Sequence, residues 1–267
     1  MVGTITPLHD SVATATPMQT AEDSYSERQT VIIFDWDDTL MASSWIDRMG
    51  LLQTEAFEHL SAQVQAQFRT LEEHAMRCLT TASKLGRVLI ITNAEHGWVE
   101  YSAKRFMPRL LPLVQSMTVV SARSSYEKFY PGAPLCWKAA AFAHEANQFF
   151  GSLEESSNRV RREMISFGDS NEERTAVKIA ASQLGAQSKS VKFVDLPTPE
   201  QLAKQVETVT GWLTWVVGHA SELDLMLKAS DFIEDPGLAQ ASFQATDLSN
   251  DSTPWRPPAM ATLDVRE

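Results

Sequence analysis

Cysteine is scarce in this sequence, and long apolar runs are absent. Its 267 residues include two cysteines, Cys78 and Cys136, which are too few for a disulfide framework or a zinc site built from thiolates. The unbroken apolar stretches are far shorter than the roughly 18 to 20 residues that a membrane-spanning helix needs. These features predict a protein without membrane spans that works in a reducing compartment, the cytoplasm or the nucleus.

Positive charge is also sparse, above all near the two ends of the chain. Residues 1–30 contain four acids and one base, Arg28, a composition unlike that of secretory signals or arginine-rich transit peptides. Residues 230–267 hold seven acids and two bases, so the central region carries only −3 of the net charge of −11. Nucleic acid, which binds clustered lysine and arginine, is therefore disfavoured as a partner.

Hydrophobic periodicity divides the chain into three parts. Residues 1–29 lack it and are predicted to form a disordered segment, whereas residues 230–267 are predicted to form an acidic, proline-containing tail. Residues 30–229 form one patterned domain without internal repeats. A domain of this size, in a chain with 43% hydrophobic residues, can bury one substantial core.

The central domain alternates short β-branched runs with amphipathic helices. A helical pattern over 57–82 is expected to break into two pieces, and another begins at the capping box of Thr198 and is expected to carry Leu202 through Leu223 inward. This alternation predicts an α/β protein with a doubly wound, Rossmann-like, mainly parallel sheet and helices on both faces. Five runs are predicted as its buried strands: 31–34, 88–91, 117–120, 164–167 and 191–194.

Polar residues follow several of these strands, at the edge where such sheets bind ligands. Asp35, Asp37 and Asp38 follow the first strand. Two carboxylates about 4 Å apart repel by roughly 4 kcal/mol at an effective dielectric of 20, so the cluster normally needs a cation or a perturbed proton. A solvated acidic turn is the ordinary alternative for such a short motif.

The second and fourth strands also end in groups that could bind a ligand. Thr92 and Asn93 present a hydroxyl and an amide after the second strand, although a threonine at this place is more often a helix cap. Asp169 follows the fourth strand, directly after a glycine that permits close approach. Ser170 and Glu173 have capping-box spacing, so the ordinary role of Glu173 is to cap the next helix.

Two lysines are candidates to face an anion at this edge. Pro134 is expected to open a helix that carries Lys138 in about its first turn, near the positive end of the helix dipole. A surface lysine lying over Trp137 is the ordinary alternative. Lys128 competes from the loop after the third strand. We favour Lys138, because a helix start is a firmer mount than a long loop.

Taken in order, these strand ends resemble the motifs of the haloacid dehalogenase superfamily of phosphotransferases. The resemblance covers roughly residues 31–195 and rests on D-x-D-x-T from Asp35, then Thr92, then Lys138, then G-D-x-x-x-E ending at Glu173. Response-regulator receivers use similar residues, but in them no acid follows the lysine. Asp169 therefore argues against a receiver.

The resemblance implies a role for each of these residues. Asp35 is the expected nucleophile and Asp37 the expected general acid and base. Thr92, Asn93 and Lys138 are expected to hold the phosphoryl group. The implied cofactor is Mg²⁺, bound by Asp35, Asp169 and the backbone carbonyl of Asp37. Glu173 is expected to contact these ligands without binding the metal itself.

The sequence departs from the family at two of these places. Asp38 stands where many relatives have glycine, and Glu173 replaces the more usual aspartate. Neither change removes a group that the chemistry requires.

The expected activity is Mg²⁺-dependent hydrolysis of a phosphomonoester through an aspartyl phosphate. The short segments after the first and second motifs predict little or no cap domain, which makes a phosphorylated protein the leading substrate. Small phosphate esters, and a non-catalytic binding protein with the same fold, remain as alternatives. Arg123 and Lys128, in the loop after the third strand, are candidates for substrate recognition, although they could instead pair with local acids such as Glu127.

Overall fold

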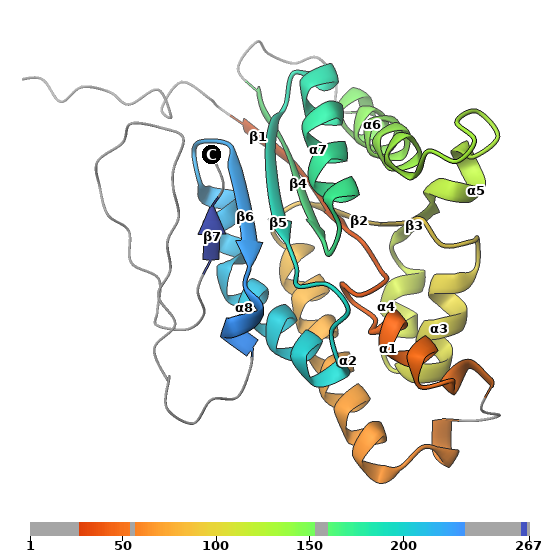
Figure 1. The fold of residues 1–267 in the computed structure, drawn as a ribbon. Coiled ribbons are helices and arrows are strands. Elements are labelled where there is room, and N and C mark those ends of the chain that lie inside the picture. The colour runs from red at the N-terminus through yellow and green to blue at the C-terminus, as the bar shows by residue number, and fades with distance from the viewer. Residues whose placement is uncertain (1–26, 54–56, 153–159, 233–262, 266–267) are drawn as a thin grey trace, which may run out of the picture.

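Figure 1 shows the fold of the protein in a computed structural model, which describes residues 27–53, 57–152, 160–232 and 263–265. The strands are β1 (Glu27–Phe34), β2 (Arg87–Thr92), β3 (Thr118–Ser121), β4 (Val160–Gly168), β5 (Gln187–Lys192), β6 (Leu223–Leu227) and β7 (Leu263–Val265). The α-helices are α1 (Ser43–Arg48), α2 (Ala62–Ala82), α3 (Trp98–Phe106), α4 (Leu111–Gln115), α5 (Ala122–Tyr126), α6 (Pro134–Ser152), α7 (Asn171–Leu184) and α8 (Pro199–Gly218). Short 3-10 turns are η2 (Leu51–Gln53), η3 (Phe57–His59) and η4 (Ala229–Phe232).

The strands form one sheet in the order β3-β2-β1-β4-β5-β6-β7. β1 to β6 pair in parallel, and β7 pairs antiparallel with β6. The predicted α/β class, parallel sheet and helices on both faces are confirmed. The chain winds outward from β1 to β3 and then returns to β4 on the other side of β1. This reversal leaves a crevice at the carboxyl ends of β1 and β4, where ligands bind in sheets of this type.

The predicted number of five strands is wrong, because β6 makes a sixth parallel strand. We expected the last helix to include Leu223, but α8 ends at Gly218 and Leu223 begins β6. In β6, Leu223, Leu225 and Leu227 are buried while the two residues between them are less buried, which is the two-residue alternation of a strand.

Side chains of β1 alternate between two hydrophobic clusters, one on each face of the sheet. Ile32 and Phe34 belong to the cluster covered by α2 and α8, whereas Val31 and Ile33 belong to the cluster covered by α6 and α7. Because Val31 to Phe34 are fully buried on both faces, the turn that follows β1 starts from a rigid base.

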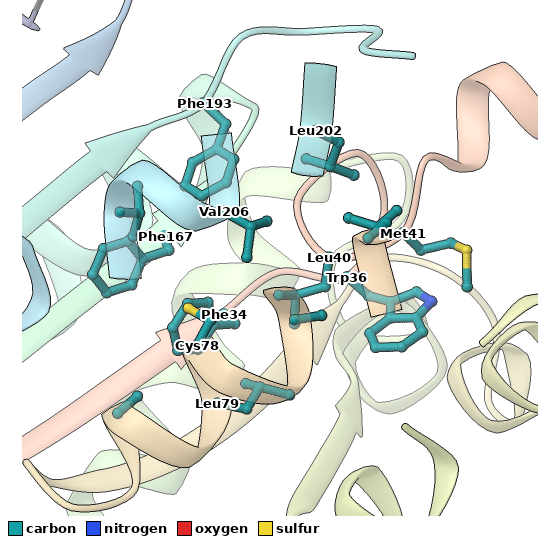
Figure 2. Packing of buried hydrophobic residues seen from close by; sticks show 14 of the residues in the cluster. Phe34, Trp36, Leu40, Met41, Cys78, Leu79, Phe167, Phe193, Leu202 and Val206 are labelled. Carbon is teal, nitrogen blue, oxygen red and sulfur yellow. The ribbon is translucent and has the colours of Figure 1, made fainter. Parts of the chain in front are cut away.

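The first cluster lies directly beneath the crevice. Phe34 and Phe167, at the ends of β1 and β4, stack with ring centroids 4.8 Å apart. Figure 2 shows them among buried side chains that α2, α8 and the turn after β1 contribute: Cys78, Leu79, Leu202, Val206, Trp36, Leu40 and Met41. This packing holds the two strand ends in register.

The segment between β1 and β2 covers the sheet. The predicted break in the helical pattern over 57–82 falls at Leu60 and Ser61, between η3 and α2, and the Ser61 side chain caps α2. α2 packs beside α8 on one face of the sheet. α2, the longest helix of this segment, therefore belongs to the layer that covers the sheet.

Little of the two predicted tails belongs to the described residues. Most of residues 1–29 and 230–267 lies outside them; the exceptions are the start of β1, most of η4 and β7. Phe232 of η4 is buried in the first cluster. No helix in the described ranges combines the length and apolarity needed to cross a bilayer.

Candidate active site

The carboxyl ends of β1, β2 and β4 meet around an open cavity of about 520 Å³. Its lining includes the predicted residues Asp35, Asp37, Thr92, Asn93, Lys138, Asp169 and Glu173. These residues come from four different parts of the sequence, and the fold brings them to one edge of the sheet. Arg123 and Lys128 are absent from the lining among the described residues.

A buried tryptophan shapes the turn that carries the acids of β1. Trp36 is fully buried, and its indole Nε1 donates a hydrogen bond to Ser102 Oγ at 2.9 Å. Its carbonyl oxygen accepts the backbone N–H groups of Leu40 and Met41, both at 2.9 Å. Because Trp36 points into the core, its neighbours Asp35 and Asp37 face the cavity.

Asp38 adopts a left-handed backbone conformation with φ +53°. Glycine adopts this conformation freely, while aspartate is one of the few other residues that tolerate it. Its buried carboxylate accepts the backbone N–H of Ser44 at 3.0 Å, near the start of α1. The geometry thus explains how an aspartate is tolerated at position 38.

Lys138 lies in the first turns of α6 and is almost completely buried, with 1% of its surface exposed. Its Nζ lies 2.5 Å from Asp35 Oδ1 and 2.7 Å from Glu173 Oε1, and it donates a hydrogen bond to the carbonyl oxygen of Ile91 at 2.8 Å. The alternative of a surface lysine over Trp137 does not hold. Lys138 is the cation that the cavity contains among its described lining residues.

The Asp37 carboxylate is held by donors from three elements. Ser43 Oγ and Trp98 Nε1 both donate to its Oδ1, at 2.5 Å and 2.7 Å, and Thr92 Oγ1 donates to its Oδ2 at 2.9 Å. The Thr92 hydroxyl also accepts the backbone N–H of Ala94 at 2.9 Å. Thr92, which we predicted to bind phosphate, thus lies between Asp37 and the loop after β2.

The end of β4 is packed so closely that only glycine fits at position 168. A Cβ added to Gly168 would lie 2.5 Å from Glu173 Cγ. Glu173 also accepts the backbone N–H of Ser170 and completes the capping box of α7. Its capping role and its contact with Lys138 therefore hold together, through the two oxygens of one carboxylate.

Burial and crowding of like charge dominate the electrostatics of the cavity. Burial raises the pKa of Asp35 well above its usual value, and the nearby acids add to this effect against the opposing charge of Lys138. Burial, with Glu173 and Asp38 nearby, raises the pKa of Asp169 to about 7. Burial opposes the charge of Lys138, but Asp35 and Glu173 outweigh it and raise the lysine's pKa. One ammonium group thus faces several carboxylates.

The oxygen ligands of this cavity fit a hard divalent cation. Within the described ranges, no three histidine, cysteine, aspartate or glutamate side chains converge on one point as a metal cluster. The expected Mg²⁺ site requires only the carboxylates of Asp35 and Asp169 with the carbonyl of Asp37, because Mg²⁺ keeps several of its waters. Burial first, and neighbouring acids after it, raise the pKa of both aspartates, and a bound cation would favour their charged form.

The two cations that we considered for substrate recognition lie within α5 and directly after it, and neither lines the cavity. Arg123 pairs with Glu127, with Nε 3.1 Å from Oε2, and its guanidinium lies 6.0 Å from the centre of the Trp137 ring. Lys128 Nζ lies 4.7 Å from the centre of the Phe129 ring. A substrate could meet them only if it extends beyond the cavity.

Two residues of the site, Ser43 and Trp98, were not predicted from the sequence. Both donate directly to Asp37, from positions six and 61 residues further along the sequence, and neither belongs to a recognisable motif with it. The only sequence signal for Trp98 is its place directly after the loop that follows β2.

No protein-family model matches the chain, and no curated protein matches it either. The case for its function therefore rests on the fold and on the geometry of this cavity.

Proposed function

We propose that the protein is a Mg²⁺-dependent phosphomonoester hydrolase that resembles the haloacid dehalogenase superfamily. The observation that carries the proposal is the contact of Asp35 with the buried ammonium of Lys138. Asp37 on the same turn, and Asp169 directly after the neighbouring strand β4, line the same cavity. A nucleophilic carboxylate, a second carboxylate two residues on and a fixed cation are the groups that phosphoryl transfer through an aspartyl phosphate needs.

In the first step, an Asp35 oxygen attacks the phosphorus of the bound ester. The bond between phosphorus and the ester oxygen breaks, and Asp37 gives its proton to the departing oxygen. Lys138 stabilises the negative charge on the transferred group. The products of this step are the alcohol and a phosphorylated Asp35.

In the second step, water attacks the phosphorus of the aspartyl phosphate. Asp37, now ionised, takes a proton from this water, and inorganic phosphate leaves while Asp35 is restored. Mg²⁺ bound by Asp35, Asp169 and the carbonyl of Asp37 would neutralise the negative charge of the phosphate and carboxylates.

A phosphorylated protein is the substrate class that the surface around the cavity favours. Large hydrophobic side chains are exposed mainly in the loops and helix starts at the carboxyl edge of the sheet, whereas Ile179 lies further along α7. We call this set the apolar rim, and among the described residues it consists of Met49, Tyr101, Phe129, Tyr130 and Leu196. Exposed apolar side chains on the segments that follow the strands suit a partner with its own apolar surface. A small phosphate ester would use the cavity alone.

Turnover of p-nitrophenyl phosphate by the full chain, with and without Mg²⁺, tests the proposal. We expect Mg²⁺-dependent activity that Asp35→Asn abolishes while circular dichroism shows an intact fold. Asp37→Asn should also lose activity but accumulate the phosphorylated protein, because the nucleophile survives while the base is gone. A folded Asp35→Asn variant with full activity would refute the assignment. Lack of turnover on a broad panel of phosphoesters would favour the non-catalytic alternative.

A further inference from the structure

The two oxygens of the Asp37 carboxylate have different surroundings. Oδ1 accepts two hydrogen bonds, from Ser43 Oγ and from the Trp98 indole, whereas Oδ2 accepts one, from Thr92. The indole N–H can only donate, while the threonine hydroxyl can both donate and accept. A proton on Oδ1 would compete with the indole N–H, which cannot accept it, and only the Ser43 hydroxyl could turn to do so. A proton on Oδ2 has no such conflict.

Trp98 is held firmly where it makes this bond. It is the first residue of α3, directly after Gly97, whose φ of +85° is one that other residues rarely adopt. Its ring also lies against Tyr101, with centroids 6.0 Å apart, and Arg105 donates to the Tyr101 hydroxyl at 2.9 Å. The indole is thus fixed at both its polar edge and its face.

We propose that Trp98 is a positioning residue that assigns the transferred proton to Oδ2 of Asp37. This inference rests on the proposed function. In the first step the proton leaves Oδ2 for the departing ester oxygen, and the electrons of the broken bond remain on that oxygen. In the second step Oδ2 regains a proton from the attacking water. Oδ1 stays unprotonated throughout, bound by Trp98 and Ser43.

The inference predicts a dependence on the leaving group. An alkoxide is a poor leaving group and needs the proton from Asp37, whereas p-nitrophenolate departs with little help. The ratio kcat/KM reports only the steps up to departure of the alcohol, so the later hydrolysis of the aspartyl phosphate does not affect it. General acid catalysis typically contributes about 10² to 10⁴ to a rate.

The test compares Trp98→Phe with the wild type on p-nitrophenyl phosphate and on β-glycerophosphate, at saturating Mg²⁺. Phenylalanine keeps an aromatic ring but lacks the N–H. We expect kcat/KM for the alkyl ester to fall at least tenfold more than for the aryl ester. Ser43→Ala, which removes the other donor to Oδ1, should shift the ratio in the same direction. Trp215→Phe makes the same chemical change on α8 and should leave the ratio as in the wild type.

Each outcome decides between the possibilities. An equal fall on both substrates would show that Trp98 only supports the structure of the cavity and would overturn the inference, as would no fall on either. If Trp98→Phe fails to fold, the ratio in Ser43→Ala decides the matter. Wild-type protein that turns over neither ester would instead refute the proposed function itself.

Discussion

At the scale of single residues, Asp38 has a backbone conformation that few residues other than glycine adopt. Its left-handed conformation would strain alanine by about 1 to 2 kcal/mol, while glycine would adopt it without strain. Its carboxylate compensates by accepting the Ser44 N–H. At position 38 the side chain therefore stabilises the fold, whereas the backbone conformation destabilises it.

Substitution of Asp38 separates these two contributions. Asp38→Gly and Asp38→Ala remove the same carboxylate, so any difference between them reports the backbone. We expect the alanine variant to be less stable by roughly 1 kcal/mol, after the greater freedom of unfolded glycine offsets part of the strain. Urea unfolding of both variants without Mg²⁺ measures the difference. Equal midpoints, or a more stable alanine variant, would contradict this account of the turn.

Asp169 is expected to lower the stability of the metal-free protein while strengthening its binding of Mg²⁺. Its buried carboxyl group faces Glu173 and Asp38, so Asp169→Ala should raise the melting temperature of the metal-free protein. The same change should weaken Mg²⁺ binding at least about tenfold, since even loss of a group that supports a metal ligand has effects of this size. Calorimetric titration and thermal melts measure the two effects. Glu127→Ala, which removes a carboxylate outside the cavity, should change neither, and unchanged Mg²⁺ affinity in Asp169→Ala would exclude it as a ligand.

Strand-end position alone led to most of the residues that line the cavity. Asp35, Thr92 and Asp169 could be predicted because each directly follows a recognisable strand, and parallel strands end at one edge. Ser43 and Trp98 could not, because nothing local distinguishes a serine or tryptophan that donates across the cavity from one that caps a helix or packs in the core.

At the scale of elements, the junction of β4 and α7 couples a glycine to the buried cation Lys138. Gly168 leaves room for Glu173, and Glu173 binds both the start of α7 and Lys138. The strand, the helix and the cation are therefore positioned by one side chain.

A double-mutant cycle tests this junction. Gly168→Ala should destabilise the protein by about 1 to 3 kcal/mol, because its Cβ would overlap the Glu173 side chain. In a Glu173→Ala background the same change should cost much less, since the overlapping atoms are gone. Urea unfolding of the four proteins gives the coupling. Gly211→Ala in α8, whose added Cβ meets nothing within 4 Å, should not destabilise, and additive effects at positions 168 and 173 would disprove the contact.

β6 shows why the strand count was underestimated. Leu223 lies seven residues after Val216, so it continues the helical spacing of α8 and periodicity alone did not separate the two elements. The short alternation of Leu223, Leu225 and Leu227 was also compatible with a helix end. β6 becomes a strand through its pairing with β5, which is a long-range interaction.

At the scale of the whole molecule, chemistry and recognition occupy different depths of one edge. The proposed catalytic groups lie near the ends of buried strands, whereas the apolar rim, Arg123 and Lys128 lie on the loops and helices that follow the strands. This separation predicts that large and small substrates depend on different residues.

Variants of the rim test the proposed protein substrate. Phe129→Ser should lower kcat/KM for a phosphorylated protein several-fold more than for p-nitrophenyl phosphate, because only the larger substrate reaches position 129. Ile179→Ser, a change from a large apolar residue to serine at an exposed position of α7, serves as the control and should shift neither value.

Arg123→Ala and Lys128→Ala should raise KM for the phosphoprotein selectively. Equal effects on both substrates would place these residues in the phosphate pocket, and no effect would leave the loop without a role in recognition.

The central position of β1 has a consequence for the dynamics of the nucleophile. β1 is paired on both sides, and the backbone N–H of Asp35 itself donates to the carbonyl oxygen of Phe167 at 2.9 Å. Amides in such a place exchange with solvent deuterium only when the whole domain opens, whereas loop amides exchange through local fluctuations. We therefore expect the Asp35 carboxylate, the proposed nucleophile, to be attached to the slowest-exchanging part of the described chain and to fluctuate less than the loops that follow the strands.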